Sequence, residues 1–209
     1  MAATVEGTVE MTSDDVPSDI DPQSGNRLPL PRREDLDERT RPIFDRLADA
    51  GGGSLAGLQG PGGIRLHSPR MAAALHETNQ YLRAEAGIEP AVRELAILVT
   101  ARENECQFEW AAHEPAAVAA GVTTDVIETV RHRRDTKGLG ETEAIVIRLG
   151  REIFAAHRVS SETFAAALRL FGQRGLVDVV SLMGQYAATA AVLIAFDQQL
   201  RPGQEPPLP

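Results

Sequence analysis

The sequence predicts an all-α protein, built as a compact bundle of about eight helices. No segment alternates apolar and polar residues with the period of two that is typical of a β-strand. Apolar residues recur instead three or four positions apart, and Ser, Thr, Pro and Gly stand where such segments begin and end. Because only 4% of the residues are aromatic, we expect Ala, Leu, Val and Ile to fill the core.

The length and charge of the chain indicate one globular domain with polar ends. A chain of 209 residues favours a single domain, which we place at 32–201. Residues 1–31 hold few large apolar side chains to offset the entropy of ordering, so we expect a flexible acidic arm there and a flexible tail over 202–209. Six acidic and no basic residues lie in 1–26, which leaves the domain nearly neutral and argues against a nucleic-acid partner.

The first part of the domain divides at Gly and Pro. From Glu34 the apolar residues recur at nearly helical spacing as far as the glycines at 51–53, which end this helix. Residues 51–63 are rich in glycine but lack the Gly-Lys-Ser/Thr ending of a phosphate-binding loop. We expect a wide turn there that can form one rim of a pocket. A Ser-Pro pair at 68–69 then begins a helix over 69–85.

The rest of the domain contains six further helical segments. Pro90 can open the first of them, Gly121 marks the end of the second, and a threonine at 123 or 124 caps the third. Their expected ranges are 90–101, 106–120, 123–131, 141–157, 160–172 and 175–199.

No targeting segment is visible at the N-terminus, which is acidic and lacks the apolar run of a signal peptide. The single cysteine excludes an internal disulfide and fits a reducing compartment, so we expect a cytoplasmic protein. The most apolar stretch, 176–196, is long enough to span a bilayer, but Asp178 and Gln185 interrupt it. We therefore expect a core or subunit-interface helix and no membrane partner.

The residues best suited to chemistry lie on the expected helix 106–120. Cys106, Glu109 and His113 stand at i, i+3 and i+7, so all three are predicted to project from one face. A carboxylate and an imidazole one turn apart can hydrogen-bond, which raises the pKa of the histidine and forms an acid–base pair. Cys106 lies near the helix N-terminus, where the helix dipole lowers the pKa of a thiol.

Glu94 adds a second carboxylate within an otherwise apolar helix. An unpaired charge facing the core would be costly at that position, so Glu94 needs a partner. The face that carries His113 is the obvious candidate.

Two other interpretations stay open for these residues. They can be an ordinary charged pair on a solvated face, with Cys106 as a small core residue. They can also form part of a zinc or iron site, because two side chains one turn apart can share a metal. A third ligand would then have to come from His76, His132, His157 or a distant carboxylate.

The pattern resembles the core of the carboxymuconolactone decarboxylase family, which also contains the alkylhydroperoxidase D-like proteins. The resemblance rests on Cys106-x-x-Glu109-x-x-x-His113 and on the run RELAIL around Glu94, twelve residues before the cysteine. It is best over 88–132, and it implies the alkylhydroperoxidase D-like fold for the bundle.

One departure separates the branches of that family. Its peroxidases carry Cys-x-x-Cys-x-x-x-His, in which the second cysteine attacks the peroxide and the first resolves it as a disulfide. Glu109 replaces the second cysteine here. The resemblance therefore implies a lyase of the carboxy-lyase type. It would use general acid–base catalysis, without cofactor or metal, on a small unsaturated lactone or carboxylic acid.

The resemblance also implies roles for the candidate residues. His113 would be the main proton donor or acceptor, Glu109 its orienting partner, Glu94 a second acid or base, and Cys106 a pocket wall or auxiliary group. Trp110 can pack in the core or bind substrate as a pocket wall. Members of the family form homo-oligomers, so we expect a trimer or a hexamer.

Two alternative functions remain. In a thiol-dependent hydroperoxide reductase, Cys106 would attack the peroxide and an external thiol would resolve the product. In a non-enzymatic oligomer, the polar face of 106–120 would serve packing alone.

Overall fold

The computed structural model describes residues 17–209 except 50 and 53, and eight α-helices lie among them. Their bounds are α1 Arg41–Ala48, α2 Pro61–Leu66, α3 Pro69–Gln80, α4 Pro90–Glu103, α5 Gln107–Ala119, α6 Thr124–Arg131, α7 Glu141–Phe154 and α8 Ser161–Ala195. A 3₁₀ turn, Arg33–Asp35, precedes α1, and a π-helical turn, Tyr81–Glu85, follows α3. The described part of the chain contains no strand, so the all-α prediction is confirmed.

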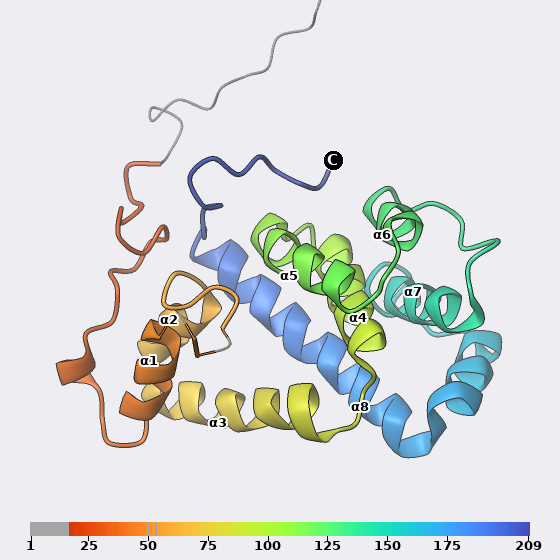
Figure 1. Cartoon of the computed structure of the whole chain (residues 1–209), viewed down its shortest axis with the longest axis horizontal. Coiled ribbons are helices and arrows are strands. Elements are labelled where there is room, and N and C mark those ends of the chain that lie inside the picture. Colours follow the sequence, from red (N-terminus) through yellow and green to blue (C-terminus); the bar gives the residue numbers. More distant parts are fainter. Residues whose placement is uncertain (1–16, 50, 53) are drawn as a thin grey trace, which may run out of the picture.

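Helix α4 forms the centre of the bundle. Every residue from Glu94 to Arg102 is buried, and α5, α7 and α8 pack around this segment (Figure 1). The sequence of α4 is apolar on most sides rather than along one stripe, which is the pattern of a helix enclosed by others. The glutamate at position 94 is therefore held inside the core.

A glycine allows α7 to approach α4 closely. A Cβ atom added at Gly150 of α7 would lie 2.4 Å from Val99 Cγ1 of α4, far inside van der Waals contact. The missing side chain lets the two helices pack at close range, as the dense interior of a protein requires.

Helix α8 crosses the bundle from α7 to α2 and bends on the way (Figure 1). The bend lies at Gly172, whose backbone is not helical, with a φ of 66° and a ψ of 177°. It divides α8 into two helical parts, which confirms the predicted boundary between the helices 160–172 and 175–199. By length and composition α8 is the one helix of the described residues that could cross a membrane, and half of its most apolar window is buried.

The region before α2 differs from the prediction. We expected a helix from Glu34, whereas α1 begins at Arg41. The Asp37 carboxylate accepts hydrogen bonds from the backbone N–H of Thr40 at 2.9 Å and from its hydroxyl at 2.7 Å, and this local turn interrupts the helical pattern. Residues 55–60 of the glycine-rich segment form turns and bends, as predicted, but α2 begins at Pro61 and ends at Leu66, where we predicted no helix.

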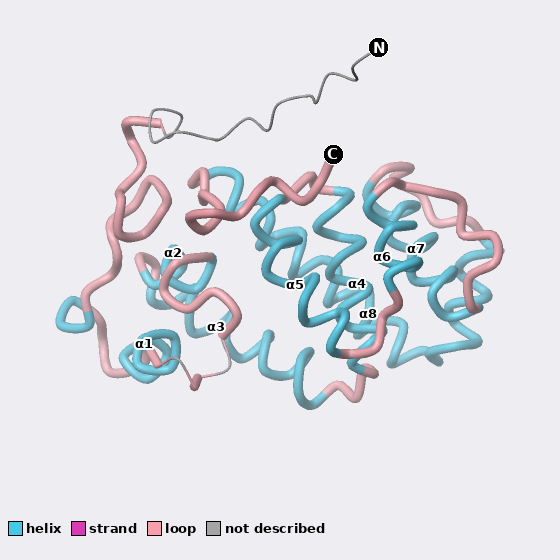
Figure 2. The backbone as a smooth tube through the Cα atoms, turned by 45° about the horizontal axis from the view of Figure 1, so that its top comes forward, coloured by secondary structure: helices cyan, strands magenta, loops and turns pink. Residues whose placement is uncertain are grey.

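Both ends of the described chain pack against the bundle. We expected flexible ends over 1–31 and 202–209; residues 1–16 lie outside the described part. Asn26 Nδ2 donates to Gln198 Oε1 at 3.0 Å, which fixes the segment from residue 17 onward beside the end of α8. Gln107 exchanges hydrogen bonds of 3.0 and 2.8 Å with the backbone of Leu208, so the tail lies over α5 (Figure 2). These contacts join residues of both predicted ends to the bundle.

Candidate active site

His113 lies between two carboxylates. Its Nδ1 is 2.7 Å from Glu94 Oε2, and its Nε2 is 3.2 Å from Glu109 Oε1. All three side chains are buried. The predicted contacts of His113 with Glu109 and with Glu94 are thus both confirmed.

A tight helical hairpin brings these residues together. Helix α4 ends at Glu103 and α5 begins at Gln107, so only a short turn separates them. Glu105 adopts a φ of 53° in this turn, which reverses the chain. The two helices then pack along their length, and Glu94 of α4 meets His113 on the facing side of α5.

The charges around Glu94 favour its ionised form. Burial acts to raise the pKa of Glu94, but the hydrogen bond from His113 and the nearby Arg83 and Arg93 outweigh it, so the pKa falls below its usual value. Arg93 Nε is 3.1 Å and Arg83 Nη2 is 3.7 Å from Glu94 Oε1. Glu94 is therefore a buried carboxylate with its compensating cations in place.

The same carboxylates hold a proton on His113. Burial acts to lower the pKa of His113, but its contacts with Glu109 and Glu94 outweigh burial and raise the pKa above its usual value. An imidazolium between two carboxylates is a proton store, because a proton can move along the contact to Glu109 with little change of geometry.

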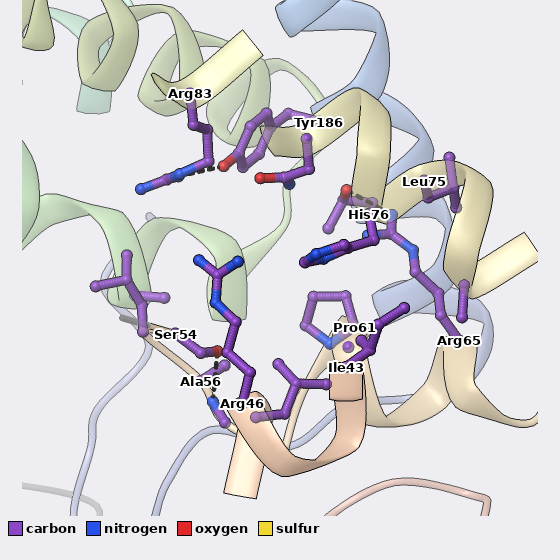
Figure 3. A pocket seen from close by; sticks show the side chains of 18 of the residues that line it. Ile43, Arg46, Ser54, Ala56, Pro61, Arg65, Leu75, His76, Arg83 and Tyr186 are labelled. Carbon is purple, nitrogen blue, oxygen red and sulfur yellow. Dashed lines mark hydrogen bonds between the residues drawn. The ribbon is translucent and has the colours of Figure 1, made fainter. Parts of the chain in front are cut away.

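A cavity of about 240 Å³ opens on one side of this cluster. Glu109 and His113 line it, and the described residues of its lining contain no carboxylate besides Glu109. Basic side chains from α1, α2, α3 and the π-helical turn surround the same opening (Figure 3). They are Arg46, Arg65, His76 and Arg83. The cavity therefore joins an acid–base pair to a positively charged wall.

Tyr186 and Arg83 support the cluster from outside the predicted set. The ring of Tyr186 meets the ring of His113 edge-on, with 5.2 Å between centroids. Arg83 donates a hydrogen bond to the Tyr186 hydroxyl (Figure 3), and burial raises the pKa of Tyr186 to about 12. Tyr186 is the only tyrosine in the most apolar stretch of the sequence, a signal that could have drawn notice. Arg83 carries no such signal in a chain with so many arginines.

Cys106 lies apart from the cavity. It is the residue before α5, in extended conformation, and does not line the cavity. Its thiol packs with Ile64 and Phe108 in an apolar cluster, and burial raises the pKa of the thiol to about 12. The predicted lowering of this pKa is therefore wrong, because desolvation outweighs the helix dipole.

Trp110 belongs to the core. Its side chain is fully buried, its Nε1 donates to Glu114 Oε2 at 2.8 Å, and the Arg131 guanidinium lies 5.1 Å above its ring. Trp110 does not line the cavity, so the structure does not support its predicted contact with substrate.

Two comparisons relate this fold and site to known proteins. A model of the carboxymuconolactone decarboxylase family matches residues 69–149, which include Glu94, Glu109 and His113. The crystal structure of an alkylhydroperoxidase AhpD core, an uncharacterized peroxidase-related protein from Ralstonia eutropha JMP134, matches with a TM-score of 0.68 and 17% identity, over 85% of this chain and 93% of that chain. At that identity the likeness concerns the fold alone. No curated protein matches the sequence significantly.

These findings define the class of the protein as all-α with an AhpD-like fold. Within this class, residues 69–149 are similar to the carboxymuconolactone decarboxylase family.

Proposed function

We propose that the cavity catalyses general acid–base chemistry on a small unsaturated carboxylic acid or lactone, either decarboxylation or proton transfer at carbon, without a cofactor. The observation that carries the proposal is the pairing of Glu109 with His113 at the cavity wall, with Glu94 holding the far side of the ring. This arrangement places a carboxylate and a stored proton where a bound molecule would lie.

The geometry favours a different division of roles from the one expected from the sequence. Glu109 lines the cavity, so it would exchange the proton with the substrate. His113 would store that proton on the nitrogen that faces Glu109. Glu94 does not line the cavity and would act as a positioning residue, because its bond to Nδ1 fixes the ring and favours the charged form.

The proposed steps balance without an oxidant or a reductant. In decarboxylation the bond to carbon dioxide breaks, and its electron pair enters the conjugated system as an enolate. A carbon of that system then takes a proton from the Glu109–His113 pair, which regains one from water. In proton transfer, Glu109 removes a proton from a carbon beside the unsaturated system and returns it at another. Arg83 carries a positive charge on the cavity wall that would stabilise the intermediate oxyanion.

The alternative, a thiol-dependent hydroperoxide reductase, requires a reactive Cys106 thiolate. Cys106 is 3% exposed, lies outside the cavity lining, and has a pKa raised to about 12. These observations support acid–base chemistry over thiol chemistry.

We also propose that the protein acts in the cytoplasm as a homo-oligomer, a trimer or a hexamer. Support for self-association comes from apolar side chains exposed on α8, including Val177, Val180 and Ile194.

The test is turnover of small unsaturated acids and lactones in D₂O, followed by proton NMR, which reports deuterium at carbon as well as decarboxylation. We expect His113→Gln to lower turnover about 100-fold or more, since general acid–base groups contribute about 10²–10⁴-fold. The matched control is Glu162→Gln, which removes a highly exposed carboxylate and should keep wild-type turnover. A folded His113→Gln variant with wild-type turnover would contradict the proposal.

A further inference from the structure

The described lining of the cavity carries more positive than negative charge. Arg46, Arg65 and Arg83 face Glu109 as the single carboxylate, and the charge of His113 is offset by Glu94 behind it. Arg83 already has partners within the protein, because it donates a hydrogen bond to the Tyr186 hydroxyl and its Nη2 lies 3.7 Å from Glu94 Oε1. Uncompensated positive charge in a partly enclosed cavity favours an anionic ligand.

Arg65 is the cavity arginine with a fixed guanidinium group and, among the described residues, a free N–H donor for such a ligand. It projects from α2, is half-buried, and its Nη2 donates to Thr189 Oγ1 of α8 at 2.7 Å, which fixes the guanidinium group. Its Nε is buried and has no hydrogen-bond partner, and no carboxylate of the described residues lies within ion-pair distance of this side chain. A buried donor without a partner costs free energy that a bound acceptor would recover.

Burial makes the charged form of Arg65 less favourable than it is in water. Burial lowers the pKa of Arg65, and the attraction of Glu109 acts against that effect without forming a direct pair. Glu109 and Arg65 therefore belong to one cavity but leave space between them. A small molecule whose one end meets Arg65 can present another atom to Glu109.

From these observations we infer that Arg65 binds the carboxylate of the substrate, so that the cavity selects small unsaturated acids over neutral molecules of the same size. The inference rests on the proposed function and narrows it, because neutral lactones become poor substrates. A guanidinium is suited to this task, since its planar N–H groups match the two oxygens of a carboxylate.

Calorimetric binding of sorbate and of its neutral amide, sorbamide, tests the inference. We expect the wild-type protein to bind sorbate about 10- to 100-fold more tightly than sorbamide, the range of a charge-assisted hydrogen bond. Arg65→Gln should bind sorbate about as weakly as sorbamide, whereas Arg65→Lys should fall between, because lysine keeps the charge but not the planar donors. Arg70→Gln removes an exposed arginine outside the cavity and should bind as the wild type does.

Several outcomes would overturn the inference. They are equal affinity of the wild type for the acid and the amide, wild-type affinity in Arg65→Gln, and failure of both sorbate and the shorter 2-butenoate to bind. Circular dichroism checks that each variant folds, and Arg65→Lys keeps the test valid if the glutamine variant does not. If the protein binds sorbate more tightly than sorbamide but catalyses no deuterium exchange at carbon, only the proposed function is contradicted. If it catalyses exchange but binds the acid and the amide equally, only the role of Arg65 is contradicted.

Discussion

At the scale of single residues, the site depends on which of two similar glutamates faces the cavity. Glu94 and Glu109 both touch His113, one at each ring nitrogen. Glu94 is enclosed by arginines inside the core, whereas Glu109 lines the cavity. The sequence predicted that the three would meet, but their spacing could not show which carboxylate reaches a ligand.

The partnership of Glu94 with His113 predicts a pH effect. The pKa of His113 is raised by the two carboxylates, so the proton needed for catalysis stays bound below that pKa and is lost as the pH rises through it. Glu94→Gln removes one of these carboxylates, which should lower the pKa of His113. The basic limb of the profile of kcat/KM against pH should therefore move to lower pH.

The control for this profile is Glu162→Gln, which should leave the limb where the wild type has it. A limb that stays in place in Glu94→Gln, or moves to higher pH, would show that Glu94 does not set the proton affinity of His113.

Cys106 gives a second prediction at this scale. Cys106→Ala should keep turnover within about twofold and cost about 1 kcal/mol of stability, because the thiol fills space in an apolar cluster and lies outside the cavity. Turnover and thermal unfolding of the same sample check both statements. Loss of turnover in a folded Cys106→Ala variant would favour the thiol mechanism.

At the scale of helices, local signals predicted well where they were strong. Pro90, Ser160 and Thr123 mark helix starts that the structure contains, and both Ser160 and Thr123 accept the expected backbone N–H at the cap. Helix α2 was missed because its glycine-rich sequence has little intrinsic helical preference. Its burial against α3 and α8 stabilises it instead, a tertiary effect that local pattern does not report.

The contact between α4 and α7 predicts opposite effects at two glycines. Gly150→Ala should destabilise the protein by about 1–3 kcal/mol, because the added methyl group would overlap Val99. Gly184→Ala on α8 meets nothing within 4 Å and should be neutral or stabilise by up to about 1 kcal/mol, since alanine favours the helix. Urea unfolding of both variants measures the difference. Equal stability of the two would contradict the close packing of α7 on α4.

At the scale of the whole molecule, the acid–base cluster and the glycine-rich rim of the cavity over 54–57 were predictable, but the rest of the cavity was not. The cluster depends on one helical hairpin close in sequence. The cavity wall combines α1, α2, α3 and α8, whose contacts span much of the chain, so no local pattern placed Arg65 or Arg83 in it. The contacts of Asn26 and Leu208 could not be predicted for the same reason, because their partners are distant in sequence.

The central claim is that Glu109 exchanges a proton with a carbon of the bound molecule. The most direct test is the rate at which deuterium from D₂O enters an unsaturated acid that the protein turns over, measured by NMR for wild type and Glu109→Gln. The account predicts a loss of about 100-fold or more in the variant with acid binding retained, because glutamine keeps the shape of the side chain but cannot accept the proton. Deuterium incorporation at the wild-type rate in a folded Glu109→Gln protein would contradict it.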